Sequence, residues 1–169
     1  MYNTRSMKMI KKMKFKEKNG FTLIELLVVM AIIAVLTTIS LASFRNVQIK
    51  ARDGQRKSDL GQLQRALELY FNDYGSYPPS DSGEITGFNW KTLDTAGSEF
   101  KDVNGTVYMK ELVGDPRANP TNYCYVSGGT YYVIYARLEN INDPKISSYT
   151  CNGETYNYEA SGPNPEPTP

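Results

Sequence analysis

A single carboxylate stands inside the longest apolar run of this chain. The twenty residues from Phe21 to Ser40 contain no proline and no glycine, and Glu25 is the one charged residue among them. An ionised carboxylate costs about 2.5–3.5 kcal/mol at the centre of a bilayer and less near the interface. Such a group calls for an explanation, so Glu25 is the first candidate functional residue. A carboxylate that reaches the headgroups, or one that pairs within its own subunit, is the simplest alternative to a role between subunits.

Other residue types limit the chemistry that this chain can do. The sequence contains no histidine, the usual general base, and no phosphate-cradling Gly-Lys-Ser/Thr motif. We therefore expect no enzyme activity, no catalytic residues and no cofactor. Cys124 and Cys151 are the two cysteines, and an even pair in the C-terminal part suits a disulfide outside the cytoplasm. Such a bridge contributes roughly 3–4 kcal/mol in the chain-entropy model.

The element that carries Glu25 is predicted to be a membrane helix. At 1.5 Å per residue, twenty helical residues span about 30 Å, the thickness of the hydrocarbon core. A plain single-pass anchor is one interpretation. A secretory signal peptide cleaved after Ser40-Leu41-Ala42 is another, but the apolar stretch is longer than the usual core of such signals, and a carboxylate near its start is unusual there.

Charge counting predicts the orientation of this helix. Residues 1–20 contain seven Lys or Arg and one Glu, which favours an N-terminus in the cytoplasm and a head outside. Five basic residues follow the apolar run between positions 45 and 57 and weaken the asymmetry. The rest of the chain after residue 20 has twelve basic and seventeen acidic residues, so it offers no general attraction to nucleic acid.

The stretch from Lys14 to Leu36 resembles the class III signal of type IV pilins and type II secretion pseudopilins. A basic leader, Gly20-Phe21, the sequence Thr-Leu-Ile-Glu ending at Glu25, and the apolar run occur in the same register. The resemblance implies that prepilin peptidase cleaves between Gly20 and Phe21 and that the new N-terminal Phe21 is methylated. It also implies that Glu25 pairs with the terminal amine of a neighbouring subunit during assembly.

Helical periodicity continues beyond the apolar run. Leu60, Leu63, Leu67, Tyr70 and Tyr74 recur at spacings of three and four, which indicates an amphipathic helix packed on a sheet. Because Gly75 suits a C-terminal cap and Tyr77-Pro78-Pro79 cannot continue a helix, the helix is expected to end near residues 73–75. Residues 67–78 also resemble the end of the long helix in pseudopilins and small pilins.

The remaining residues predict a loop followed by a small sheet. We expect a loop over 76–105 anchored by Phe88 and Trp90, then a short helix or turn through 108–112. Strands are predicted at 123–126 and 130–138, joined by Ser127-Gly128-Gly129, with a weaker third strand at 155–159. Alternation places one set of side chains of the second strand toward the helix: Tyr132, Ile134, Ala136 and Leu138.

The predicted fold is α+β and pilin-like, with a long N-terminal helix, transmembrane and then amphipathic, packed on a small C-terminal antiparallel β-sheet. Five parts are expected: a cleaved basic leader (1–20), a transmembrane and filament-core helix (21–42), an amphipathic helix (43–74), a globular head with an αβ-loop and the sheet (75–160), and a disordered proline-rich tail (161–169).

The resemblance implies a structural subunit of a type IV pilus or pilus-like filament. Its expected partners are prepilin peptidase, copies of itself and other pilins, the assembly platform and its ATPase, and the inner membrane, which it crosses once before joining a periplasmic or cell-surface filament. The alternatives are a pseudopilin of a type II secretion system and a DNA-binding minor pilin of a competence system. The second alternative requires the basic residues between Arg45 and Lys57 to be exposed.

Two further features bear on the choice within this family. Many type IV pilins staple their C-terminal region with a disulfide, whereas many major pseudopilins do not, so the cysteine pair favours a pilus subunit. Major pseudopilins often bind calcium in a C-terminal loop. Asp115, Asn119, Asp143 and the carbonyls of residues 140–142 could supply oxygen ligands, but their spacing matches no ligand pattern. Turn-forming roles are expected instead, and no metal site.

Overall fold

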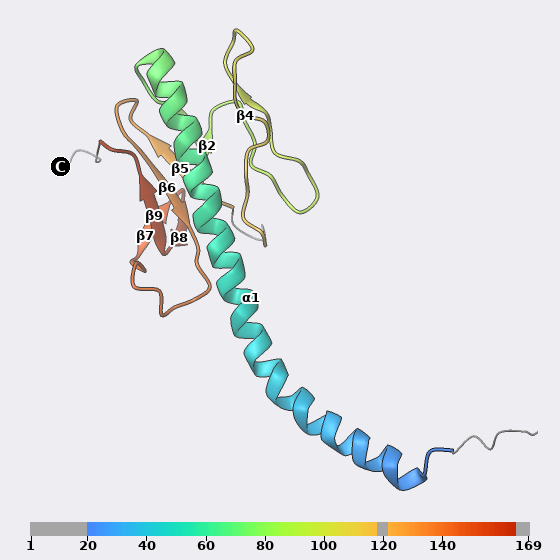
Figure 1. Cartoon of the computed structure of the whole chain (residues 1–169). Helices are drawn as coiled ribbons and strands as arrows, with labels where there is room; N and C mark the ends of the chain where they lie inside the picture. The colour runs from blue at the N-terminus through green and yellow to red at the C-terminus, as the bar shows by residue number, and fades with distance from the viewer. Residues whose placement is uncertain (1–19, 118–121, 165–169) are drawn as a thin grey trace, which may run out of the picture. The chain divides into compact units, whose positions relative to one another are not determined.

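The computed structural model describes residues 20–117 and 122–164, with the side chains of residues 39–43 left out. Its contacts divide the chain into two compact units, Met1–Ala42 and Ser43–Pro169. The predicted leader, apart from Gly20, and the end of the predicted tail, residues 165–169, lie outside the described residues. The predicted α+β architecture is confirmed, because one long helix is followed by antiparallel strands (Figure 1).

The helix is α1 (Leu23–Tyr74). The strands follow in chain order: β1 (Ser80–Asp81), β2 (Glu84–Ile85), β3 (Phe100–Lys101), β4 (Val107–Met109), β5 (Cys124–Ser127), β6 (Tyr132–Ala136), β7 (Tyr149–Cys151), β8 (Glu154–Tyr156) and β9 (Tyr158–Ser161). All strand pairs are antiparallel, and the largest sheet has the order β5-β6-β9.

The C-terminal end of α1 is where the sequence predicts it. Gly75 has a φ of +70° and donates its N–H to the carbonyl of Phe71 at 2.7 Å. This left-handed cap satisfies one of the last helical carbonyls, and glycine adopts it without a steric penalty. Tyr77 and Pro78 then turn inward and are buried in the head.

The core of the second unit lies between α1 and the three-stranded sheet. Leu60, Leu63 and Leu67 of the helix are fully buried, as the spacing of three and four predicts. They share one cluster with Tyr132 and Ile134 of β6. The face of β6 that the sequence assigns to the helix is confirmed, since Tyr132, Ile134 and Ala136 all lie in the cluster with the helix leucines. The fourth predicted member, Leu138, is buried but follows the end of the strand. Figure 1 shows β5, β6 and β9 alongside this half of α1.

The other face of the sheet is covered by the β7–β8 hairpin. Cys124 of β5 and Cys151 of β7 form a disulfide that closes a loop with a sequence separation of 27 residues. Both cysteines are buried with Tyr156, and Tyr135 of β6 packs against the same cluster. The bridge adds a covalent tie between this hairpin and the main sheet, at a gain of roughly 3–4 kcal/mol. It supplements the hydrogen bonds of Arg137 with the carbonyl of Thr155 and the ring contacts of Tyr135.

Three predicted elements differ from the structure. The segment predicted as a loop over 76–105 contains the short strands β1, β2 and β3, because the chain folds back on itself there in two-stranded antiparallel pairs. The segment predicted as a short helix or turn at 108–112 begins instead as β4, which pairs with β3. The weak third strand at 155–159 is divided at Asn157 into β8 and β9. Asn157 accepts the N–H of Leu138 at 2.6 Å and donates to the carbonyl of Leu138 at 2.9 Å. This side-chain bridge ends one strand and starts the next, and β9 continues to Ser161.

Candidate assembly site

The first turn of α1 is closed by a reciprocal pair of hydrogen bonds between Thr22 and Glu25. The Thr22 N–H donates to Glu25 Oε2 at 2.9 Å, and the Glu25 N–H donates to Thr22 Oγ1 at 3.3 Å. The Thr22 hydroxyl also donates to Glu25 Oε2 at 2.8 Å. Because the Thr22 carbonyl accepts the N–H of Leu26, Thr22 is the N-cap and Glu25 is the third helical residue. This arrangement is a capping box.

The role of Thr22 is the functional feature that sequence reasoning missed. The signal was present as Thr-x-x-Glu directly before an apolar run, which is the sequence pattern of a capping box. The structure therefore gives the Glu25 carboxylate a partner within its own chain. Gly20 and Phe21 precede the helix in non-helical backbone and are exposed, so the peptide bond between them lies just outside the first turn.

The helix surface that follows Glu25 is apolar and uncovered in the first unit. Its large hydrophobic side chains from Phe21 to Leu36 are all exposed. Thr37 and Thr38 donate their hydroxyls back to the helical carbonyls of Ile33 and Val35, at 2.9 and 2.7 Å. These bonds satisfy both hydroxyls inside the helix, which suits surroundings that offer no water. An apolar surface of this extent requires other apolar groups to cover it.

Within the part of the chain that the structure describes, no helix is both long and apolar enough to qualify as a membrane span. The predicted transmembrane segment includes residues 39–42, whose side chains lie outside the described part.

In the second unit, the C-terminal half of α1 holds a buried arginine surrounded by carboxylates. Arg56 is 2% exposed and makes a two-pronged ion pair with Asp115, through Nε at 2.6 Å and Nη2 at 2.9 Å. Its Nη1 donates to Asp53 at 2.7 Å and to Glu139 at 2.9 Å. Burial disfavours the charged guanidinium, but the hydrogen bonds that it donates to these carboxylates outweigh this effect and raise the pKa of Arg56. We call Arg56 with Asp53, Asp115 and Glu139 the Arg56 cluster.

The Arg56 cluster attaches two loops of the head to the helix. Asp53 accepts the backbone N–H groups of Glu139 and Asn140 at 2.9 and 2.8 Å. Glu139 also pairs with Arg52 of the helix at 2.6 Å and with Arg117 at 3.0 Å. The loop after β6 is thus held to α1 by charge-assisted hydrogen bonds that involve both the side chain of Glu139 and the backbone N–H groups of the loop.

Two of the acids that the sequence offered as possible calcium ligands take part in ion pairs with α1. Asp115 is committed to Arg56, and Asp143 forms an ion pair with Lys57. Among the described residues, no group of three or more acidic, histidine or cysteine side chains is arranged to hold a metal ion. The expectation that Asp115 and Asp143 act purely as turn formers is incomplete, because both also anchor loops to α1. Asn119, the other candidate ligand, lies outside the described residues.

The same contacts weaken the DNA-binding alternative. Of the five basic residues between positions 45 and 57, Arg52, Arg56 and Lys57 are paired with carboxylates of the head. Arg45 and Lys50 are exposed. A duplex-binding surface requires several cations free to meet phosphates, and this stretch of the helix does not provide them.

Acid is expected to destabilise the head through this network. The hydrogen bond from Arg52, followed by those of Arg56, lowers the pKa of Glu139 from 4.5 to about 2, and Lys57 lowers the pKa of Asp143. Stabilisation by a carboxylate with a lowered folded-state pKa is complete above its unfolded pKa and is lost as the pH falls toward the folded value. Asp59 opposes the trend, because burial raises its pKa.

We therefore expect the free energy of unfolding to fall as the pH is lowered from about 4.5 toward 2, with Glu139 as the main contributor. Urea unfolding followed by the fluorescence of Trp90, the single tryptophan, measures this quantity at each pH. Glu139→Gln should flatten the dependence. An unchanged slope in that variant would remove Glu139 from the explanation.

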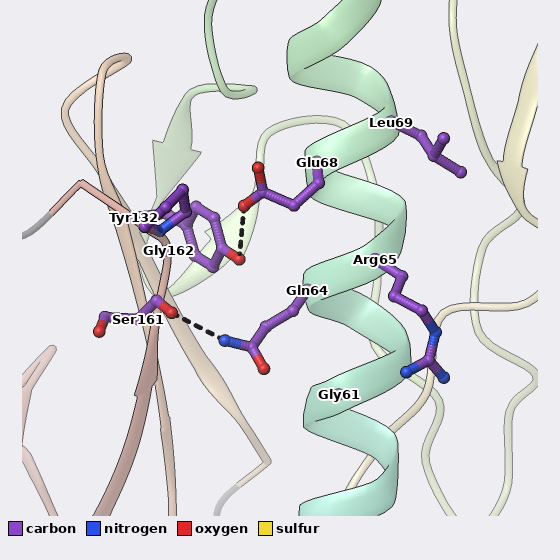
Figure 2. Close-up of a pocket in the computed structure, with 9 residues that line it drawn as sticks. Gly61, Gln64, Arg65, Glu68, Leu69, Tyr132, Ser161 and Gly162 are labelled. Atoms are coloured by element: carbon purple, nitrogen blue, oxygen red, sulfur yellow. Dashed lines mark hydrogen bonds between the residues drawn. The ribbon is translucent and has the colours of Figure 1, made fainter.

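A shallow groove of about 870 Å³ runs between α1 and the free edge of β9. Figure 2 shows its two cross-links: Gln64 donates to the carbonyl of Ser161 at 2.7 Å, and the Tyr132 hydroxyl donates to Glu68 at 3.1 Å. Burial, together with the nearby Glu68 carboxylate, raises the pKa of Tyr132. One of these links fastens the edge strand β9 to the helix through Ser161, and the other fastens β6 through Tyr132.

Comparison with known proteins places these features in a family. The sequence model of the prokaryotic N-terminal methylation motif matches residues 15–41. Type II secretion system core protein G of Aeromonas hydrophila is 29% identical over 119 residues, which cover 70% of this chain and 80% of that protein. Its counterpart in Pseudomonas aeruginosa is 30% identical over 118 residues, with the same two coverages. The chain belongs to the type IV pilin and pseudopilin family.

Other members of the family match over shorter stretches. The type IV major pilin protein PilA of Myxococcus xanthus is 36% identical over 76 residues, or 44% of this chain and 34% of that pilin. No solved structure gives a significant match. The predicted recognition is confirmed, and so is the predicted class of function: this family member is a structural, pilin-like filament subunit, and its N-terminal motif fits processing by prepilin peptidase.

Proposed function

We propose that this protein is made as a single-pass inner-membrane precursor, cleaved between Gly20 and Phe21 on the cytoplasmic side, and methylated on Phe21. Copies of the mature chain then bundle their apolar helices in the core of a filament, with the heads on the outside. The assembly platform and its ATPase extract the subunits from the membrane. The observation that carries the proposal is the capping-box carboxylate of Glu25 at the start of a helix whose large apolar side chains are exposed.

The position of the peptide bond supports the cleavage step. Gly20 lies in non-helical, exposed backbone, and an added Cβ at Gly20 would have no neighbour within 4 Å. A protease needs such an extended, accessible segment at the bond that it cuts. Mass spectrometry of the mature N-terminus tests this step directly. A chain that begins at Phe21 with a methylated amine is expected, and a chain that begins at Met1 or Ser43 would refute the proposal.

Among filament types, the extent of similarity favours a pseudopilin of the secretion type. The match to core protein G covers 80% of that protein, while the match to the Myxococcus pilin covers 34% of the pilin. The disulfide remains the feature that points toward a pilus subunit. Deletion of the gene discriminates the two: loss of surface filaments indicates a pilus, whereas a secretion defect without visible filaments indicates a pseudopilus.

The charge of Glu25 is proposed to fix the axial register of the subunits. After cleavage, the amine of Phe21 carries a positive charge, and in a water-poor helix bundle the Glu25 carboxylate of a neighbour is its natural partner. Leaving either charge unpaired in such a bundle is costly, about 3–5 kcal/mol for a buried pair. Wrong registers are therefore penalised.

Glu25→Gln isolates this role, because glutamine at the same position preserves a capping box but removes the charge. The variant should be processed and retained in the membrane, while the yield of sheared filaments falls by roughly tenfold or more, the factor that corresponds to about 1.4 kcal/mol. Thr22→Val is the matched control, since it breaks the capping box and keeps the carboxylate. Filaments of normal yield and length from Glu25→Gln would discard the register role.

A further inference from the structure

The hairpin of β3 and β4 carries a motif that the proposed function does not account for. Asn104-Gly105-Thr106 has the Asn-x-Thr spacing of an asparagine glycosylation acceptor. The sequence contains one other Asn-x-Thr, Asn119-Pro120-Thr121, but a proline at the middle position excludes it from this chemistry. Asn104 is therefore the single acceptor of this type in the chain.

The structure places this motif at an exposed turn. Asn104, Gly105 and Thr106 are all exposed, and Val103 beside them is 96% exposed. Gly105 has a φ of +87°, and an added Cβ at that position would meet no atom within 4 Å. A glycan is bulky and needs a surface site of this kind. Space for it is open around the turn within the described part of the head.

The turn is also held in one conformation by Asp102. Its Oδ1 accepts the N–H of Asn104 at 2.9 Å and the N–H of Thr106 at 2.7 Å. Its own N–H donates to the carbonyl of Thr106 at 3.0 Å. These bonds fix the backbone on both sides of the acceptor. The side chains of Asn104 and Thr106 therefore extend from neighbouring positions of one ordered loop.

The acceptor nitrogen itself is weakly engaged. Asn104 Nδ2 donates to the Tyr74 hydroxyl at 3.4 Å, which is long for a hydrogen bond. The base of the hairpin is anchored independently, because Phe100 of β3 is fully buried in the head and stacks on Tyr70 of α1. A substituent on Nδ2 therefore disturbs neither the core nor the strand pairing.

We propose that Asn104 is an N-glycosylation site, modified by an oligosaccharyltransferase that uses a polyprenyl-pyrophosphate-linked glycan as the donor. The Asn104 Nδ2 forms a bond to the anomeric carbon of the first sugar, and the bond from that carbon to the pyrophosphate oxygen breaks. The amide releases one proton, and the lipid pyrophosphate leaves. The inference rests on the proposed placement of the head outside the cytoplasm. An oxidising compartment there would also preserve the Cys124–Cys151 disulfide.

Trypsin offers a clean readout of this site. Cleavage after Lys101 and Lys110 releases the peptide 102–110, in which Asn104 is the single asparagine. The full-length protein is co-expressed with an asparagine-specific oligosaccharyltransferase, a lipid-linked glycan of known mass, and a control acceptor protein. The mass of the peptide should rise by the mass of the glycan. Thr106→Ser should keep the glycoform, whereas Thr106→Ala and Asn104→Gln should reduce it at least tenfold.

The same digest separates failure of this site from failure of the proposed placement. A reduced Cys124–Cys151 pair would show that the head does not reach an oxidising compartment, which overturns the placement and the site with it. An intact disulfide with an unmodified peptide, while the control acceptor is glycosylated, overturns the site alone. A gain of about 1 Da, the mass change of deamidation at Asn104-Gly105, without a glycan overturns it equally.

Discussion

Arg56→Met is expected to destabilise the head by about 3–5 kcal/mol, the cost of breaking a buried ion pair from one side. Methionine fills much of the same space, so the loss reports on charge rather than on a cavity. Asp53 and Asp115 would then remain in a buried site without the guanidinium that binds both. Urea unfolding of the full-length protein in micelles, followed by Trp90 fluorescence, measures the change.

Arg65→Met is the matched control, because Arg65 lies on the same helix and is exposed. It should change the free energy of unfolding by less than about 0.5 kcal/mol. Arg56→Lys should fall between the two, since a lysine cannot reproduce the two-pronged contact with Asp115. Adding Asp115→Asn to Arg56→Met should recover part of the loss. Equal effects of Arg56→Met and Arg65→Met would contradict the assigned role of the cluster.

Gly20→Val is expected to abolish processing and to leave a full-length precursor in the membrane. The space around Gly20 in the chain itself is open, so valine does not disturb the subunit. The obstruction arises at the protease, which must approach the backbone closely at the bond that it cuts, and a β-branched side chain prevents that approach. Gel mobility and intact mass of the membrane fraction distinguish precursor from mature chain.

Gly54→Ala provides the control for this variant. Gly54 is a helical glycine of α1 with no atom within 4 Å of an added Cβ, so alanine there should leave processing normal and favour the helix by up to about 1 kcal/mol. A mature-sized product from Gly20→Val, in amounts similar to those from Gly54→Ala, would place the cleavage elsewhere.

The elements that depend on local signals were predictable from the sequence. The end of α1 follows from Gly75 and the prolines after it, and the buried face of β6 follows from strict alternation. The short strand β4 was not predictable in this way, because its pairing with β3 depends on the side chain of Asp102 closing the turn. Strand propensity alone does not say which other segment a short strand pairs with.

The candidate site likewise contains residues that local sequence signals could reveal and residues that they could not. Glu25 stands out because a charge in an apolar run is conspicuous, and Thr22 could have been found from its spacing to Glu25. The Arg56 cluster could not have been found, since its members are separated by up to 86 residues and meet only when the head is folded. Acids judged one at a time in the sequence look like turn formers or metal ligands.

The capping box at Thr22 has a consequence for a subunit that is not yet part of a filament. Because the Glu25 carboxylate bonds to Thr22 of its own chain, a subunit of the proposed pathway would not hold a bare anion in the bilayer before it is assembled. The Thr22 hydroxyl and N–H bond to the carboxylate but do not neutralise its charge. In the proposed filament, the opposite charge therefore comes only from the neighbour's amine, and the register still depends on it.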